Sequence, residues 1–218
     1  MQPEFRLFQT DYKKFSVIIS KLYMSFLSIN KFESTIAGFF GSKFCVATDC
    51  CTHAVELSLR LTKPEYVICP THTYISIPFT LEKLGLNWGW TDDKWIEYYH
   101  ITNRVIDAAV LWRENSYIQG TLMCISFQYK KHLNLGRGGC VLLDNKQEYE
   151  LLKKMSYDGR SYDRPWSQQD IKTIGYHYYM TPETAQKGID IFPQAKSKPA
   201  RRWSYEDYPY LKDMSVFK

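Results

Sequence analysis

The stretch that most constrains this chain runs from Ser126 to Gly139 and reads Ser-Phe-Gln-Tyr-Lys-Lys-His-Leu-Asn-Leu-Gly-Arg-Gly-Gly. It lies between two short apolar runs, residues 122–125 and 140–144. Apolar runs of this length, bounded by turn residues, are typical of buried strands. We therefore expect two strands joined by a loop that carries a serine, two lysines, a histidine and three glycines. In an open α/β sheet, such loops are where ligands bind.

The adjacent lysines of this loop, Lys130 and Lys131, allow two interpretations. A lysine among apolar walls loses the hydration of its charged form, so its pKa falls and the neutral amine becomes a nucleophile toward a carbonyl carbon. The other interpretation is a solvated turn whose lysines face water. Residue types alone favour the solvated turn.

The order of the residues changes this balance. The segment resembles the pattern Ser-Phe-x-x-x-Lys-x-(Leu/Ile)-x-x-Gly-x-Gly-Gly, the cofactor-lysine segment of the DegT/DnrJ/EryC1/StrS family of pyridoxal phosphate (PLP) sugar aminotransferases. Counting five residues on from Ser126, or five back from Gly136, selects Lys131 as the Schiff-base lysine. In the family's dehydratases a histidine takes the lysine position. Here the histidine is the neighbouring His132, so the resemblance favours transamination.

Composition sets the broad class of the protein. A chain of 218 residues with 44% hydrophobic and 23% charged residues is typical of a soluble globular protein with one substantial core. It has neither an apolar run long enough to span a bilayer nor the N-terminal pattern of a signal peptide. Its six cysteines form no CxxC pair, which argues against a zinc site and favours reduced thiols. We expect a cytoplasmic protein with no membrane segment and no metal site.

The net charge of +5 is modest, and much of the excess lies in residues 196–202. A nucleic-acid-binding protein would need a basic face with aromatic stacking platforms on a recognised module. The sequence shows none, so nucleic acid is an unlikely partner. Salt-dependent binding to a duplex would revive that alternative.

The segment from Asp49 to Leu59 has apolar residues at helical spacing, and Thr52 is a plausible N-cap. The free amides and positive dipole end of such a helix suit a phosphate. The segment resembles the family's Asn-Ser-Gly-Thr-(Ser/Asp)-Ala loop, which implies that Thr52 and His53 hold the PLP phosphate. Cysteines at 50 and 51 replace the family's Ser-Gly pair.

Two further segments resemble the family. Pro70 to Tyr74 is similar to Pro-x-x-Thr-(Phe/Tyr/Trp), which implies that Tyr74 stacks on the pyridine ring. Residues 105–109 resemble Glu-Asp-Ala-Ala-(Gln/His), which implies that Asp107 faces the pyridine nitrogen and keeps it protonated. Val110 replaces the family's Gln or His. Ser126 is expected to add a hydroxyl for the phosphate.

Residues 175–182 resemble the family's Gly-Tyr-Asn-Tyr-Arg-Met-(Thr/Ser), in which the Asn reaches the phosphate of the neighbouring subunit. His177 and Tyr179 stand at the Asn and Arg positions. The resemblance therefore implies a homodimer with shared active sites, in which His177 donates a hydrogen bond across the interface. A packed interface histidine is the alternative.

These segments predict an α/β protein: a three-layer α/β/α fold with a mostly parallel sheet, like the large domain of fold-type I PLP-dependent transferases. We expect an N-terminal docking segment (1–30), a PLP-binding large domain (31–189) and an extended C-terminal tail (190–218). The resemblance ends near residue 188, before the family's C-terminal domain, so the chain resembles a short form.

Two functions remain open. The first is a PLP-dependent aminotransferase that moves an amino group from an amino acid, glutamate in the simplest case, to a nucleotide-linked keto-sugar. Lys131 and Asp107 would then be catalytic. The second is a catalytically reduced member that binds PLP, or serves as a partner subunit, without turnover.

Overall fold

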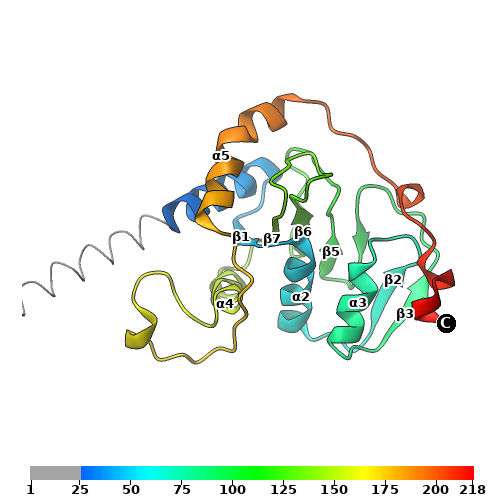
Figure 1. Cartoon of the computed structure of the whole chain (residues 1–218), viewed down its shortest axis with the longest axis horizontal. Helices are drawn as coiled ribbons and strands as arrows, with labels where there is room; N and C mark the ends of the chain where they lie inside the picture. Colours follow the sequence, from blue (N-terminus) through cyan, green and yellow to red (C-terminus); the bar gives the residue numbers. More distant parts are fainter. Residues whose placement is uncertain (1–25) are drawn as a thin grey trace, which may run out of the picture.

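The computed structural model describes residues 26–218 (Figure 1). Most of the expected docking segment, residues 1–25, lies outside the described part. Residues 26–40 are helical. Gly41 follows with a φ of 81°, a left-handed conformation that favours glycine. The N–H groups of Gly41 and Ser42 both donate to the carbonyl of Ala37, at 2.9 and 3.0 Å. The glycine therefore ends this helix.

A five-stranded sheet in the order β1-β7-β6-β5-β4 forms the centre of the molecule. Its strands are β1 (Phe44–Thr48), β4 (Tyr99–His100), β5 (Val105–Asp107), β6 (Leu122–Ser126) and β7 (Gly139–Leu143). β2 (Val67–Pro70) and β3 (Trp88–Thr91) form a separate parallel pair. The pairings show that β1, β5 and β6 run in one direction, while β7 and β4 run in the other. The expected common direction thus holds for β1, β5 and β6, with β7 inserted between two of them.

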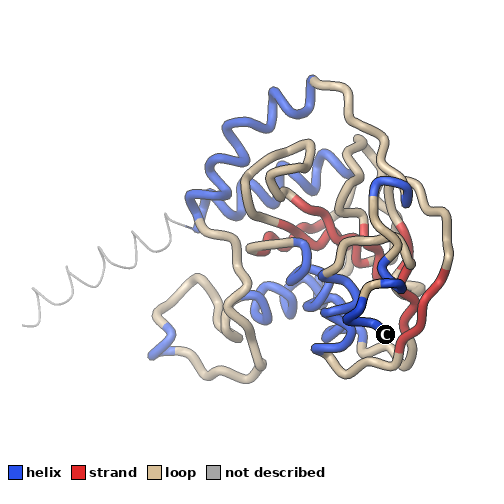
Figure 2. Tube along the Cα trace, turned by 45° about the vertical axis from the view of Figure 1, so that its right-hand side comes forward, coloured by secondary structure: helices blue, strands red, loops and turns tan. Residues whose placement is uncertain are grey.

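Helices cover both faces of the sheet (Figure 2). Alternate residues of each strand point to opposite faces. On β1, Cys45 and Ala47 join the core beneath the 26–40 helix and α5 (Pro182–Ser197), whereas Val46 joins the core beneath α2 (Cys51–Thr62), α3 (Ser76–Lys83) and α4 (Lys146–Ser156). The structure therefore has the predicted three-layer α/β/α architecture.

The segment after residue 189 differs from the expected extended tail. Helix α5 continues to Ser197, so the boundary placed at 189/190 falls inside it. The helix continues because Ile191 and Phe192 pack against the core and Ala195 is buried there. Beyond α5 the chain crosses the molecule in short 3-10 turns, drawn from orange to red in Figure 1. These turns are η2 (Tyr205–Asp207), η3 (Leu211–Asp213) and η4 (Ser215–Phe217). A fourth, η1 (Trp166–Gln168), lies in the loop after α4.

A buried ion pair joins the two helical layers. Glu33, on the 26–40 helix, is 4% exposed. Its Oε1 accepts a hydrogen bond of 2.8 Å from the Ala47 amide on β1, and both of its oxygens accept from Lys153 Nζ of α4 at 2.9 Å.

Across residues 26–218, none of the helices combines the length and hydropathy that a membrane span requires.

Candidate active site

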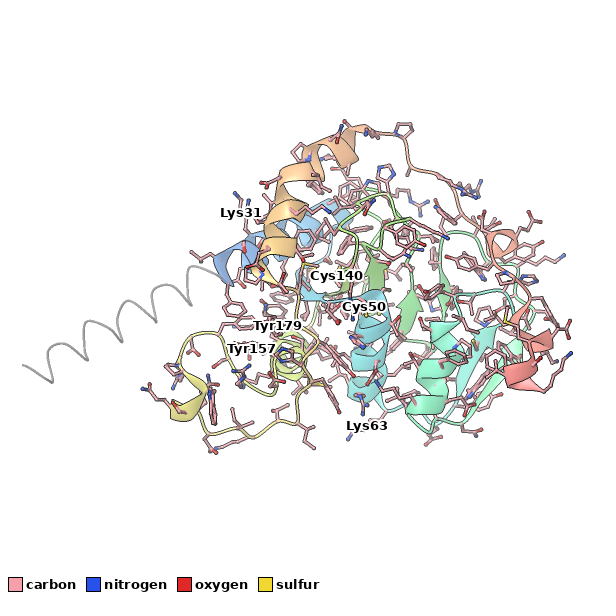
Figure 3. All side chains as sticks on the ribbon, viewed as in Figure 1. Lys31, Cys50, Lys63, Cys140, Tyr157 and Tyr179 are labelled. Atoms are coloured by element: carbon pink, nitrogen blue, oxygen red, sulfur yellow. The ribbon has the colours of Figure 1, made fainter. Side chains whose placement is uncertain are left out.

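A cavity of about 690 Å³ lies at the carboxyl ends of β5 and β6 and at the start of α2. Figure 3 marks this end of α2 with Cys50. Five of the seven residues predicted for the site line the cavity: Thr52, Tyr74, Asp107, Ser126 and Lys131. Because these residues are up to 79 positions apart in the sequence, the fold alone brings them together.

Asp107 is the last residue of β5 and is 5% exposed. Its Oδ2 accepts a hydrogen bond of 2.6 Å from the Tyr99 hydroxyl, and its Oδ1 accepts one of 2.9 Å from the Ala109 amide. Burial raises the pKa of the carboxyl above its usual range, although Tyr99, Ala109 and the Lys131 charge oppose the increase. A cation placed beside Asp107 would lower that pKa and be held by the carboxylate.

The two adjacent lysines lie in different environments. Lys130 also lines the cavity but is exposed, with its ammonium 5.6 Å from the centre of the Tyr129 ring. Lys131 lines the cavity, and its Nζ donates a hydrogen bond of 3.4 Å to the Tyr208 hydroxyl. Burial lowers the pKa of Lys131, and the negative charge of Asp107 only partly opposes this. Lys131 therefore has the environment of a nucleophilic amine, whereas Lys130 matches the solvated turn.

The start of α2 forms another wall of the cavity. The helix begins at Cys51, and its N-cap is Cys50, in an extended conformation with no side-chain cap. The expected cap, Thr52, is wrong because this residue is already helical, and its hydroxyl lies 2.8 Å from that of Ser76. The first-turn amides are therefore not capped by a side chain of the N-cap residue. Such a helix start attracts anions.

Gly139 on β7 makes this arrangement possible. A Cβ at this position would lie 2.3 Å from the backbone nitrogen of Cys51, so only glycine lets β7 approach the start of α2 so closely. Cys51 itself is buried, and burial raises the pKa of its thiol well above the usual value. The thiol stays neutral and adds no negative charge to the anion-attracting end of the helix.

The remaining predicted wall residues are Tyr74 and Ser126. Tyr74 lines the cavity with 55% of its surface exposed, so its ring is free to cover a flat ligand. Ser126, at the end of β6, is buried, and its Oγ accepts a bond of 3.4 Å from the Gln128 amide. Together with Thr52 it places hydroxyls near the start of α2.

A model of the DegT/DnrJ/EryC1/StrS aminotransferase family matches residues 15–116 and 117–207. The chain belongs to this family. The match confirms the resemblance seen in the loop of residues 126–139 and extends it to residue 207.

Solved structures share the fold of this family member. AtS13 from Actinomadura melliaura has a TM-score of 0.67 at 18% identity, over 78% of this chain and 61% of its own. The sugar aminotransferase CalS13 from Micromonospora echinospora has a TM-score of 0.66 at 15% identity, over 77% and 60%. Helicobacter pylori PseC, an aminotransferase involved in pseudoaminic acid biosynthesis, gives 0.63 at 13% identity, over 77% and 58%. The chain thus spans about three fifths of these relatives. No curated protein sequence matches significantly.

His53, predicted from the family pattern, does not line the cavity of this family member. Its Nδ1 lies 2.6 Å from Asp49 Oδ1, and its ring stacks on Tyr178 with the ring centres 3.6 Å apart. Burial lowers the pKa of His53, but the hydrogen bonds to Asp49 and Cys50 outweigh it and raise the pKa to about 9. The His53 side chain is therefore engaged by Asp49 and Tyr178 outside the cavity, and its expected role in phosphate binding stays a prediction.

His177 also lies outside the cavity. Its side chain is 69% exposed, and its Nδ1 is 3.0 Å from Asp158 Oδ2. Tyr179, at the family's Arg position, packs edge-on against the His177 ring. An exposed histidine is free to contact another subunit, so the expected interface role stays a prediction.

Sequence reasoning missed five aromatic residues that line the cavity, and three of them, Tyr99, Trp203 and Tyr208, contact Asp107 or Lys131. Tyr99 lies on the two-residue strand β4, which is too short to produce a periodic pattern. The other two follow the point where the recognised motifs end. The only available signal was the density of aromatic residues between 203 and 210.

Proposed function

We propose that this protein is a PLP-dependent aminotransferase that moves an amino group from an amino acid, with glutamate as the first candidate, to a nucleotide-linked keto-sugar. One observation supports this most: a single cavity contains a partly buried amine with a lowered pKa, Lys131, and a buried carboxyl, Asp107. Perturbed groups of opposite charge in one cavity are typical of active sites. Family membership supports the same activity.

The residues present fit PLP. The start of α2, with no side-chain cap from Cys50, suits the phosphate, and the hydroxyls of Thr52 and Ser126 are beside it. Tyr74 is free to cover the ring, and Asp107 would pair with the pyridine nitrogen. When bound, PLP supplies an aldehyde carbon for an amine and a ring that stores negative charge.

In this proposal the chain's own residues bind, orient and transfer protons. Lys131 would hold the cofactor through its amine, and the same amine, when free, would accept and return a proton at Nζ. Asp107 would keep its ring partner protonated. Trp203 and Tyr208 line the cavity on the lysine side and would exclude water from it.

A second candidate is a member that binds PLP without turnover or acts as a partner subunit. Two observations favour it. Val110, which lines the cavity, replaces a polar family residue, and Cys51 replaces a glycine.

The nucleic-acid alternative is weaker, since Lys196 pairs with Glu114 at 3.0 Å and Arg201 pairs with Asp207.

Adding glutamate to the PLP-loaded protein separates these candidates. A working enzyme discharges its visible absorption band and releases one 2-oxoglutarate per site without any sugar present. A band that glutamate leaves unchanged, with no keto acid formed, would contradict the aminotransferase and favour cofactor binding alone. We also expect the working enzyme to be a homodimer in which the two chains share their active sites.

A further inference from the structure

The cavity is closed on one side by the chain's own C-terminal segment, residues 203–211. Three backbone hydrogen bonds fix this segment to residues near the cavity. The Glu97 amide donates to the Trp203 carbonyl at 2.9 Å, the Tyr205 amide to the Trp95 carbonyl at 3.1 Å, and the Leu211 amide to the Thr71 carbonyl at 2.8 Å. Trp95 and Glu97 are themselves wall residues. The segment is therefore a fixed wall of the cavity.

Within this segment, Tyr208 is fixed from several directions. Its carbonyl lies 2.8 Å from His72 Nδ1, and its amide donates to the Tyr205 carbonyl at 3.2 Å. Its ring packs against Trp95, with the ring centres 5.5 Å apart. Since a tyrosine ring turns about only two torsions, these contacts leave its hydroxyl little freedom.

The Tyr208 hydroxyl is the hydrogen-bond partner of the Lys131 amine among residues 26–218, at 3.4 Å. Asp107 from β5 and Lys130 from its own loop act on this amine through their charge, and the Cys51 thiol of α2 would do so only if ionised. The Trp203 ring centre lies 5.4 Å away. A lysine has four rotatable side-chain bonds, so a fixed acceptor at its tip selects one placement of the nitrogen.

We propose that Tyr208 is a positioning residue for Lys131, holding its amine nitrogen in the orientation that presents it to the cavity. The inference rests on the proposed function, in which that amine holds the cofactor. Tyr208 acts through Lys131, and the segment that carries it is supplied by the same chain.

Competitive labelling of the full-length, cofactor-free protein with trace acetic anhydride tests this. The rate of acetylation at each lysine is followed from neutral to high pH by peptide mass spectrometry, in the wild type, Tyr208→Phe and Tyr210→Phe. Tyr210 is the matched control, because it lies on the same segment and packs against His72 rather than lining the cavity. Lys130 is the internal reference.

We expect Tyr208→Phe to lower the plateau rate at Lys131 about 2- to 10-fold, the range that one hydrogen bond supports. The half-labelling pH should also fall, because the ammonium loses an acceptor. Lys130 and the Tyr210→Phe variant should match the wild type. Should Tyr208→Phe not fold, Tyr208→Leu removes the same hydroxyl.

A Tyr208→Phe profile that superimposes on the wild type overturns the proposal. So does an equal change at Lys130, since that would indicate general loosening of the segment. The readout is independent of the proposed function: a protein that never attaches PLP, yet shows the shift at Lys131, would refute the aminotransferase and retain the positioning role.

Discussion

At the residue scale, two neighbouring lysines illustrate how position decides chemistry. Lys130 and Lys131 have the same side chain and both line the cavity, yet Lys130 is exposed, whereas Lys131 is partly buried and has a lowered pKa. The difference comes from burial, which removes part of the hydration of the Lys131 ammonium. The amine of Lys131, which interacts with Asp107, is therefore the one that can act as a nucleophile.

Ser126 tests the phosphate end of the cavity. We predict that Ser126→Ala weakens PLP binding about 10-fold or more, because one hydrogen bond to a charged group is lost. Binding of pyridoxal, which has no phosphate, should be unchanged. Equilibrium titration with both compounds measures this. Equal weakening of both would place the phosphate elsewhere.

His53 gives a pH-dependent prediction. Its pKa is raised to about 9 in the fold, so its stabilising contribution is complete below the unfolded value near 6.5 and disappears as the pH rises through 9. Near pH 6 the free energy of unfolding of the wild type should exceed that of His53→Gln by on the order of 2 kcal/mol. This difference should disappear above pH 9.

Urea unfolding at a series of pH values measures that gap. His100→Gln, at an exposed position on β4, is the control and should show no such trend. A stability difference that stays constant with pH would show that the contact of His53 with Asp49 does not depend on its charge.

At the element scale, the layers depend on a few buried polar contacts. Glu33 joins the 26–40 helix to β1 and, through Lys153, to α4. We predict that Glu33→Gln costs about 3–5 kcal/mol, because it leaves the Lys153 charge buried without its partner. The double variant Glu33→Gln/Lys153→Met should regain much of this in denaturant unfolding. A double variant no better than the single one would contradict the ion-pair account.

The strands and helices were predictable where local pattern and burial agree. The apolar runs around 122–125 and 140–144 became β6 and β7. Thr52 is not the N-cap, because α2 already begins at Cys51 and Cys50 therefore takes the N-cap position. The continuation of α5 beyond residue 189 was missed, because it depends on tertiary packing that maintains the helix through Pro193.

The candidate site was predictable only in part, for a related reason. Motif order identified Lys131, Asp107, Tyr74, Thr52 and Ser126, and these share one cavity. The side chains of His53 and His177 point to local acidic partners instead. Tyr208 reaches Lys131 from 77 residues away, a contact that no local pattern encodes.

At the scale of the whole molecule, the chain builds a three-layer fold and then returns across the carboxyl ends of its own strands. The exposure of His177 leads to a prediction about assembly. If two chains share sites, mixing Lys131→Ala with His177→Ala protomers should restore activity, because both defects then fall in one of the two sites.

The measurement is amino transfer after the two inactive variants are unfolded together and refolded, with each variant refolded alone as the control. Recovery in the mixture supports shared sites. A dimer that forms, by light scattering, without recovering activity would indicate sites complete within one chain.

The central claim is that Lys131 is the residue that holds PLP, and borohydride reduction of the loaded protein tests it most directly. We predict that reduction fixes one pyridoxyl group per chain, located on Lys131 by peptide mapping. Lys130→Ala should retain it, and Lys131→Ala should lose it while remaining folded. A tag on Lys130, or no tag on a folded wild-type protein, would contradict the account.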